Sequence, residues 1–169
     1  IDWLRIAVGG HSAGANATAG ISILANQSRE FSIKLQILDY APLDLYTPVE
    51  FKPDAYKMTS PGIDRMRFYD SLYCDNDEKL LPTVSPLHAP MEMLTGLPEA
   101  LIITAGMDCL REEAEKYALK LIQAGVPVTA RRFLKSHHGF VVRRIEEFAE
   151  AEEMIYSALK KAFAAEVHT

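Results

Sequence analysis

The stretch that most constrains the fold of this chain lies near its start. The apolar residues from Leu4 to Val8 predict a short buried strand over residues 4–8, and small residues predict a helix over 12–25 that packs closely on a sheet. Between them lies the pentapeptide Gly10-His11-Ser12-Ala13-Gly14. Glycines on either side of Ser12 let the backbone turn tightly, so we expect Ser12 to stand exposed on a strained strand-to-helix turn.

A serine on such a turn has two chemical interpretations. The start of the following helix presents free backbone N–H groups, which would stabilise an oxyanion that forms beside the serine. The same glycine-rich geometry can instead bind a phosphate, and the short motif also occurs by chance. We interpret Ser12 as a nucleophile and look to the rest of the chain for its partners.

Strands and helices alternate along the chain. Further strands are predicted over residues 33–38, 100–105 and 126–134, and helices over 111–124 and 141–164, with a loop at 135–140. This alternation predicts a single α/β domain over residues 1–169, with a parallel sheet of about four strands flanked by helices. Arg131 and Arg132 place the last strand at an edge of the sheet.

Residues 46–90 interrupt this regular pattern. Six prolines break the segment, and only residues 63–73 look like a short amphipathic helix. We expect this insertion to form a lid or cap, because long irregular insertions in a small domain commonly cover a binding site. A surface excursion without function is the alternative.

Composition excludes several classes of protein. A net charge of −5 does not suit a nucleic-acid-binding surface, and no apolar run is long enough to span a bilayer. Two cysteines, Cys74 and Cys109, form neither a disulfide framework nor a metal site and favour a reducing, cytoplasmic location. The chain begins with Ile1 almost directly inside a strand, so we expect further sequence upstream.

Three polar residues follow three of the predicted strands. Ser12, Asp108 and His138 occur in this order along the chain, and the carboxyl ends of parallel strands meet at one rim of a sheet. Histidine is the natural base for a serine hydroxyl, and a carboxylate behind it fixes the tautomer. His137 competes for the role of base and Asp44 for that of acid, although Asp44 fits a structural turn better.

Several blocks of this sequence resemble the hormone-sensitive-lipase-like esterases. The similar blocks are Gly10–Gly14, Val84–Leu87, Leu97–Gly106, Gly106–Glu113 and His138–Phe140. The resemblance implies an α/β-hydrolase fold, no cofactor, and a small carboxylic ester with a short acyl chain as substrate. The spacings of His and carboxylate residues indicate no metal site. The resemblance further implies Ser12 as nucleophile, Asp108 as orienting acid and His138 as base. It also implies the Ala13 N–H as one oxyanion donor and Gly10 and Gly14 as the glycines of the nucleophile turn.

The sequence departs from this family in two ways. His11 stands where the best-known members have Asp, and we interpret it as a turn residue. The His-Gly-Gly-Gly-type loop that supplies further oxyanion donors is absent, as is the first half of the sheet. Because one lost donor costs about 3–4 kcal/mol of transition-state stabilisation, the activity of the isolated chain is in doubt. We expect a carboxyl-terminal half, whose first strand pairs with another copy or with a missing amino-terminal half.

Other interpretations remain open. The same triad would serve a peptidase or thioesterase, and a non-catalytic fragment or subunit could keep it while acting only by association. We expect Cys109 to be a small buried thiol and His88 a surface residue. Trp3 and Tyr73 are expected in the core or at an interface.

Overall fold

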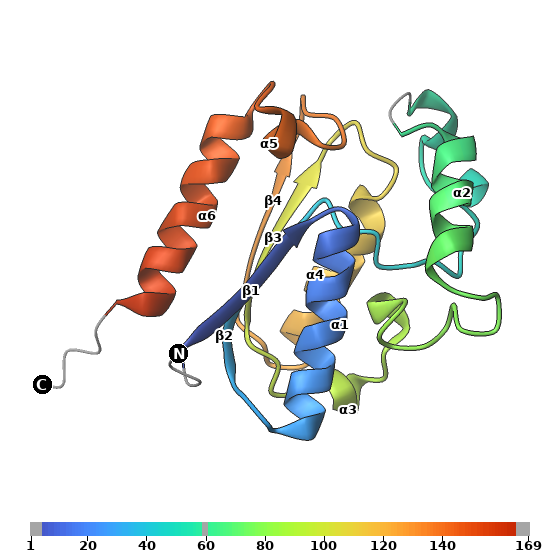
Figure 1. Cartoon of the computed structure of the whole chain (residues 1–169). Helices are drawn as coiled ribbons and strands as arrows, with labels where there is room; N and C mark the ends of the chain where they lie inside the picture. The colour runs from blue at the N-terminus through green and yellow to red at the C-terminus, as the bar shows by residue number, and fades with distance from the viewer. Residues whose placement is uncertain (1–4, 59–60, 165–169) are drawn as a thin grey trace, which may run out of the picture.

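One parallel sheet forms the centre of the protein (Figure 1). The computed structural model describes residues 5–58 and 61–164. Its strands are β1 (Ile6–His11), β2 (Ile33–Asp39), β3 (Glu99–Ala105) and β4 (Val128–Phe133), which lie side by side in this order. The predicted sheet of four parallel strands is therefore confirmed, with β4 at one edge and β1 at the other. Trp3 and Leu4 lie outside the described residues.

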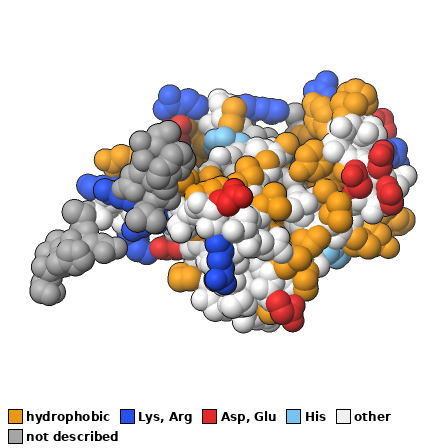
Figure 2. Space-filling view, turned by 60° about the horizontal axis from the view of Figure 1, so that its bottom comes forward, with side chains coloured by type: hydrophobic (Ala, Val, Ile, Leu, Met, Phe, Trp, Pro, Cys, Tyr) orange, Lys and Arg blue, Asp and Glu red, His pale blue; other side chains and the backbone are white. Residues whose placement is uncertain are grey.

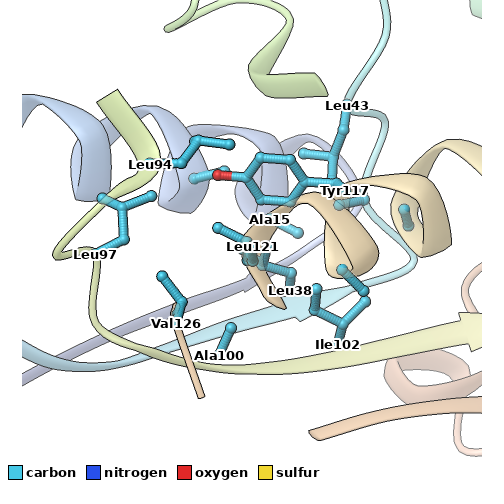
Figure 3. Close-up of a cluster of buried hydrophobic side chains, with 14 of the residues drawn as sticks. Ala15, Leu38, Leu43, Leu94, Leu97, Ala100, Ile102, Tyr117, Leu121 and Val126 are labelled. Carbon is cyan, nitrogen blue, oxygen red and sulfur yellow. The ribbon is translucent and has the colours of Figure 1, made fainter. Parts of the chain in front are cut away.

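Helices cover both faces of the sheet (Figure 1). On one face lie α1 (Ala13–Ser28) and α4 (Arg111–Gln123), and on the other α5 (Phe140–Arg143) and α6 (Phe148–Phe163). Alternate residues of β3 point to opposite faces of the sheet, so that Ile102 packs in the core under α1 and α4 and Leu101 in the core under α5 and α6. In the core under α1 and α4 the Tyr117 ring lies among apolar side chains of both helices and the sheet (Figure 3).

The prediction of one closing helix over residues 141–164 is wrong. The chain forms two helices, α5 and α6, because Arg144 and Glu146 between them have left-handed backbone conformations with φ of 55° and 57°. The Ile145 N–H donates to the Phe140 carbonyl and closes α5. Neither Gly nor Pro marks this break, and the apolar spacing continues across it.

The first helix is longer than predicted. It continues through Asn26 and Gln27 to Ser28 and ends at Arg29, whose φ of 57° places it in the left-handed region. Polar residues are tolerated here because this last turn of the helix faces solvent, where side chains need no apolar neighbour.

The segment between β2 and β3 contains short helices around α2 (Ile63–Tyr73), whose bounds agree with the prediction. The others are η1 (Val49–Phe51), η2 (Ala55–Lys57), η3 (Pro86–His88) and α3 (Met91–Leu94). Several large apolar side chains of this segment are exposed, among them Phe51 and Leu72. On the side of the molecule that α2 occupies, hydrophobic and acidic side chains lie close together on the surface (Figure 2).

Candidate active site

Ser12 lies on a strained turn between β1 and α1. Its φ of 52° and ψ of −120° are unusual for a residue with a side chain, and such a conformation costs roughly 1–3 kcal/mol. Its N–H donates to the Asp39 carbonyl at 2.9 Å. Its carbonyl accepts from the N–H groups of Ala15 and Asn16 at 2.9 and 3.1 Å. The surrounding backbone therefore holds the predicted turn in place.

The two glycines of the motif differ in their surroundings. A Cβ atom on Gly10 would lie 2.3 Å from the carbonyl carbon of Gly14, so the close approach of these two backbones requires glycine at position 10. A Cβ atom on Gly14 would meet nothing within 4 Å among the atoms of the structure. The turn therefore depends on Gly10 much more than on Gly14.

Hydrogen bonds connect Ser12, His138 and Asp108 in one chain. The Ser12 Oγ lies 2.9 Å from Nε2 of His138, and Nδ1 of the same ring lies 2.7 Å from Oδ2 of Asp108. Asp108 is 1% exposed and His138 7%, so water hardly competes for these bonds. With the Nδ1 proton donated to the carboxylate, Nε2 is free to accept the serine proton.

Residues beyond the strand ends fix this geometry. Asp108 follows β3, and its Oδ1 accepts the Leu110 N–H at 3.0 Å, which orients the carboxylate. His138 lies in the loop after β4, and this loop is held by Glu147, which follows the break between α5 and α6. The Glu147 carboxylate accepts hydrogen bonds from the Lys135 N–H and the Ser136 hydroxyl at 3.0 and 2.9 Å. Sequence patterns did not indicate this role for Glu147.

His137 and Asp44, which competed for two of these roles, hydrogen-bond elsewhere, and Cys109 is the small buried thiol that the sequence predicted. His137 is exposed and its Nδ1 lies 2.7 Å from Glu146. Asp44 Oδ1 accepts two backbone N–H groups of its own turn and lies 2.8 Å from Nε2 of His88. The Cys109 thiol is buried 3.3 Å from the Met58 sulfur, and burial raises its pKa to about 12. The structure therefore brings none of the three to Ser12.

A cavity of about 440 Å³ opens beside Ser12 and His138. Its walls come from the start of α1, the turn after β2, the region of α2 and the loops after β3 and β4. They are mainly apolar. The lining residues are Ser12, Ala13, Asn16, Pro42, Leu45, Pro61, Arg65, Met66, Tyr69, Asp70, Leu72, Tyr73, Leu110, His138 and Arg143. Ala13 opens α1, where the first-turn N–H groups have no partner within the helix.

The comparisons with known proteins agree with this fold. The profile of the family described as alpha/beta hydrolase fold matches residues 1–142. The chain belongs to the α/β-hydrolase fold family. This confirms the α/β-hydrolase fold that the resemblance implied.

The relatives of this α/β-hydrolase chain include a hormone-sensitive lipase and carboxylic ester hydrolases, as its residue blocks indicated. It is 36% identical over 145 residues to the carboxylic ester hydrolase LipN of Mycobacterium tuberculosis, covering 81% of this chain and 38% of that protein. It is 34% identical over 94 residues to the hormone-sensitive lipase of Ictidomys tridecemlineatus, covering 56% and 11%. The solved esterase of Pyrobaculum calidifontis superposes with a TM-score of 0.84 at 34% identity, covering 98% and 55%. The chain thus spans about half the length of that esterase and less of the two curated relatives.

Asn16 connects α1 to the segment that walls the cavity, and the sequence analysis missed it. Its Nδ2 donates to the carbonyls of Pro42 and Val84 at 2.7 and 2.8 Å, and its Oδ1 accepts the Tyr73 hydroxyl at 2.9 Å. The side chain is 2% exposed, so all these bonds are shielded. A polar residue on the buried face of a small-residue helix was the signal that could have identified it.

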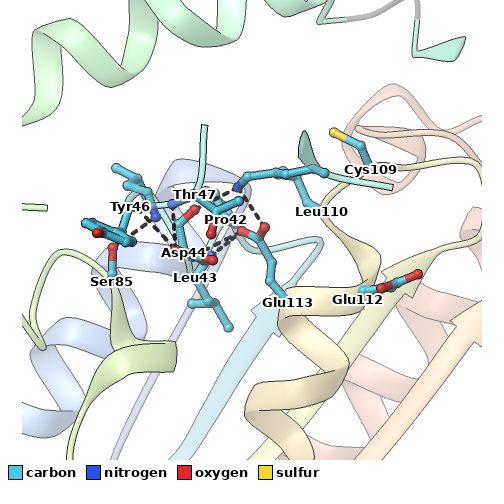
Figure 4. A network of polar contacts seen from close by, with 12 residues as sticks. Pro42, Leu43, Asp44, Tyr46, Thr47, Ser85, Cys109, Leu110, Glu112 and Glu113 are labelled. Atoms are coloured by element: carbon cyan, nitrogen blue, oxygen red, sulfur yellow. Dashed lines mark hydrogen bonds and ion pairs between the residues drawn. The ribbon is translucent and has the colours of Figure 1, made fainter. Parts of the chain in front are cut away.

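A buried ion pair fixes the turn after β2 (Figure 4). Glu113 points from α4 towards this turn, and its Oε1 accepts the N–H groups of Leu43 and Asp44 at 2.7 and 3.2 Å. Its Oε2 accepts from the Lys52 ammonium at 2.6 Å, and Lys52 also donates to the Asp44 carbonyl. Burial raises the pKa of Glu113 to about 7, although Lys52 and the two N–H groups oppose the rise. The pair anchors the turn after β2, which forms part of the cavity wall, to α4.

His11 does more than turn the chain, which corrects its interpretation as a turn residue. It is the last residue of β1, and its Nδ1 lies 2.6 Å from Oδ2 of the buried Asp39.

The described residues provide neither a metal cluster nor a membrane-spanning helix. Within 5–58 and 61–164, no group of three or more His, Cys, Asp and Glu side chains is arranged to hold a metal ion. No helix in these ranges has the length and apolar character needed to cross a membrane.

Proposed function

We propose that this chain carries the catalytic triad of a serine carboxylesterase, with Ser12 as nucleophile, His138 as base and Asp108 as orienting acid. The observation that carries the proposal is the hydrogen-bonded chain from the Ser12 hydroxyl through His138 to Asp108, on a strained turn that opens into an apolar cavity. The names of the relatives, which are ester hydrolases and lipases, support the same chemistry.

The proposed reaction proceeds through an acyl-enzyme. His138 Nε2 takes the Ser12 hydroxyl proton while Oγ forms a bond to the ester carbonyl carbon. The negative charge that develops on the carbonyl oxygen faces the Ala13 N–H at the start of α1. The tetrahedral intermediate then loses the alcohol, which leaves with the proton from His138. Water, activated by the same ring, hydrolyses the acyl-enzyme and releases the acid. No cofactor or metal takes part.

We infer that the substrates are small carboxylic esters with short acyl chains. A cavity of about 440 Å³ is sufficient for a small ester, and its apolar side chains suit an acyl group. The segment 46–90 supplies part of this wall through α2, which supports its proposed role as a lid. The triad would also serve a thioesterase or peptidase, since it does not specify the leaving group.

The unpaired edge of β1 supports a proposal about partners. β1 is the first strand of the sheet, with no neighbour beyond it in the described part of the chain. We propose that an amino-terminal half or a second copy pairs here and brings further oxyanion donors to Ser12. The alternative proposal is that the chain acts mainly through this pairing, as a non-catalytic subunit. The two free cysteines support a reducing, cytoplasmic location.

Hydrolysis of p-nitrophenyl esters from acetate to decanoate tests the proposed function. The purified chain is compared with Ser12→Ala, with His138→Gln and with the matched control His137→Gln. We expect hydrolysis of the short esters by the wild type and by His137→Gln, and only the buffer rate for the other two variants. Equal rates for wild type and Ser12→Ala would overturn the proposal that this chain is active by itself.

A further inference from the structure

His11 and Asp39 end two neighbouring strands beside the Ser12 turn. They lie opposite each other in the β1–β2 register, with Nδ1 of His11 2.6 Å from Oδ2 of Asp39. The Asp39 carboxylate is fully buried, and its Oδ1 has no hydrogen-bond partner in the described structure. His11 is 41% exposed. Because one oxygen of this buried carboxylate has no partner, the stability of the carboxylate in its position depends strongly on the group that binds the other oxygen.

Asp39 also contacts the candidate nucleophile through its backbone. Its carbonyl accepts the Ser12 N–H at 2.9 Å, so one residue holds the His11 ring by its side chain and the Ser12 amide by its main chain. A shift of Asp39 would therefore move the strained turn on which the Ser12 hydroxyl stands.

Tyr40 extends this connection to the candidate base. Its φ of 39° and its N–H bond to the Ile103 carbonyl at 2.8 Å fix the backbone directly after Asp39. Its ring stacks on His11 with 5.8 Å between centroids and meets His138 edge-on at 4.9 Å. The ring thus lies in contact with both the His11–Asp39 pair and the imidazole that faces Ser12.

The pKa values of both members of the pair are raised. The hydrogen bond to Asp39 raises the pKa of His11, and burial raises the pKa of Asp39 to about 6 although His11 opposes the rise. The other titratable or charged groups near the pair are His138, Asp108, the Tyr40 phenol and Arg143. Once His11 loses its proton, the buried negative charge of Asp39 is no longer balanced by a positive charge on the ring that it binds.

We propose that His11 and Asp39 are positioning residues, which hold the Ser12 turn and the Tyr40 ring in place and hold them most firmly while His11 is protonated. The inference rests on the proposed function of Ser12 and His138, and adds a second pair that acts through them.

The first test measures the rate at which diethyl p-nitrophenyl phosphate modifies Ser12, from about pH 6 to about pH 9. We expect His11→Ala to slow modification about tenfold, because a displaced turn misaligns the attacking oxygen. In the wild type we expect the rate to decline at high pH as His11 loses its proton. His11→Asn, whose amide can still donate to Asp39 but does not titrate, should recover most of the rate that His11→Ala loses and show no such decline. His137→Ala removes an exposed His–Glu pair of similar length and should keep the wild-type profile.

The second test needs no reactivity. In ¹⁵N NMR titrations of the histidine rings, we expect the His138 signals of the wild type to shift as His11 titrates. In His11→Asn this shift should be absent. Equal modification rates for His11→Ala and His137→Ala, with His138 signals that ignore His11, would overturn the inference. Should Ser12 stay unmodified even in the wild type, the proposed function fails, and the titration still decides whether the two sites are coupled. If His11→Ala does not fold, the titration and the His11→Asn variant still decide whether the two sites are coupled.

Discussion

The two glycines around Ser12 provide a test of whether the turn is built as described. A Cβ atom on Gly10 would lie 2.3 Å from the carbonyl carbon, 2.4 Å from the carbonyl oxygen of Gly14 and 2.8 Å from the Ala15 nitrogen. All three are backbone atoms at the start of α1, so no side-chain rotation can relieve the contact. We expect Gly10→Ala to lower the free energy of unfolding by about 3 kcal/mol, the upper part of the usual range for overpacking.

Gly14→Ala is the matched control within the same motif. It adds the same methyl group four residues away, where nothing lies within 4 Å, and it replaces glycine inside a helix. We expect its stability to be unchanged or raised by up to about 1 kcal/mol. Urea unfolding followed by circular dichroism measures both variants, with equal m values as the sign that only stability changed. A Gly10→Ala variant as stable as Gly14→Ala would refute the described packing of the turn.

Three further predictions concern buried charges and thiols. Lys52→Met leaves the buried Glu113 carboxylate without its cation, so urea unfolding should show a free energy of unfolding lower by about 3–5 kcal/mol. Adding Glu113→Gln should restore part of this loss, and a loss below about 1 kcal/mol would contradict the proposed anchor. Asp39 has a pKa raised from 3.8 to about 6, so its contribution to stability is present below about pH 4 and is lost as pH rises through about 6. The stability of wild type relative to Asp39→Asn should therefore fall by up to about 3 kcal/mol over this window in unfolding curves at several pH values, and a difference that rises with pH would reverse the assignment. N-ethylmaleimide should modify the half-buried Cys74 in the folded protein and Cys109 only after unfolding, as mass spectrometry can follow; equal rates in the folded state would show that Cys109 is accessible.

Local patterns were sufficient to predict the arrangement of strands and helices. A continuous apolar run such as Ala100–Ala105 predicts a buried strand even when its tertiary contacts are unknown. Parallel strands then bring their carboxyl ends to one rim of the sheet. This is why Ser12, Asp108 and His138 could be proposed together before their distances were known. The strained backbone conformation of Ser12 was also predicted from its place between a strand and a helix.

What the sequence did not indicate depends on contacts between distant residues. Asp39 lies 28 positions from His11, and Glu113 lies 61 from Lys52, so no local spacing marks either pair. The break after α5 depends on left-handed conformations at Arg144 and Glu146, residue types that ordinarily favour helix. Tertiary contacts of their neighbours, such as those of Glu147 with the His138 loop, replace helical hydrogen bonds there.

The measurement that tests the central claim most directly is the position of the adduct formed by diethyl p-nitrophenyl phosphate. The reagent transfers its phosphoryl group to an activated serine and releases p-nitrophenol, and peptide mass spectrometry locates the modified residue. The proposed triad predicts an adduct on the peptide that contains Ser12 and much slower modification in His138→Gln. Modification of other serines at the same rate, or a Ser12 rate that His138→Gln leaves unchanged, would contradict the claim that Ser12 is the nucleophile.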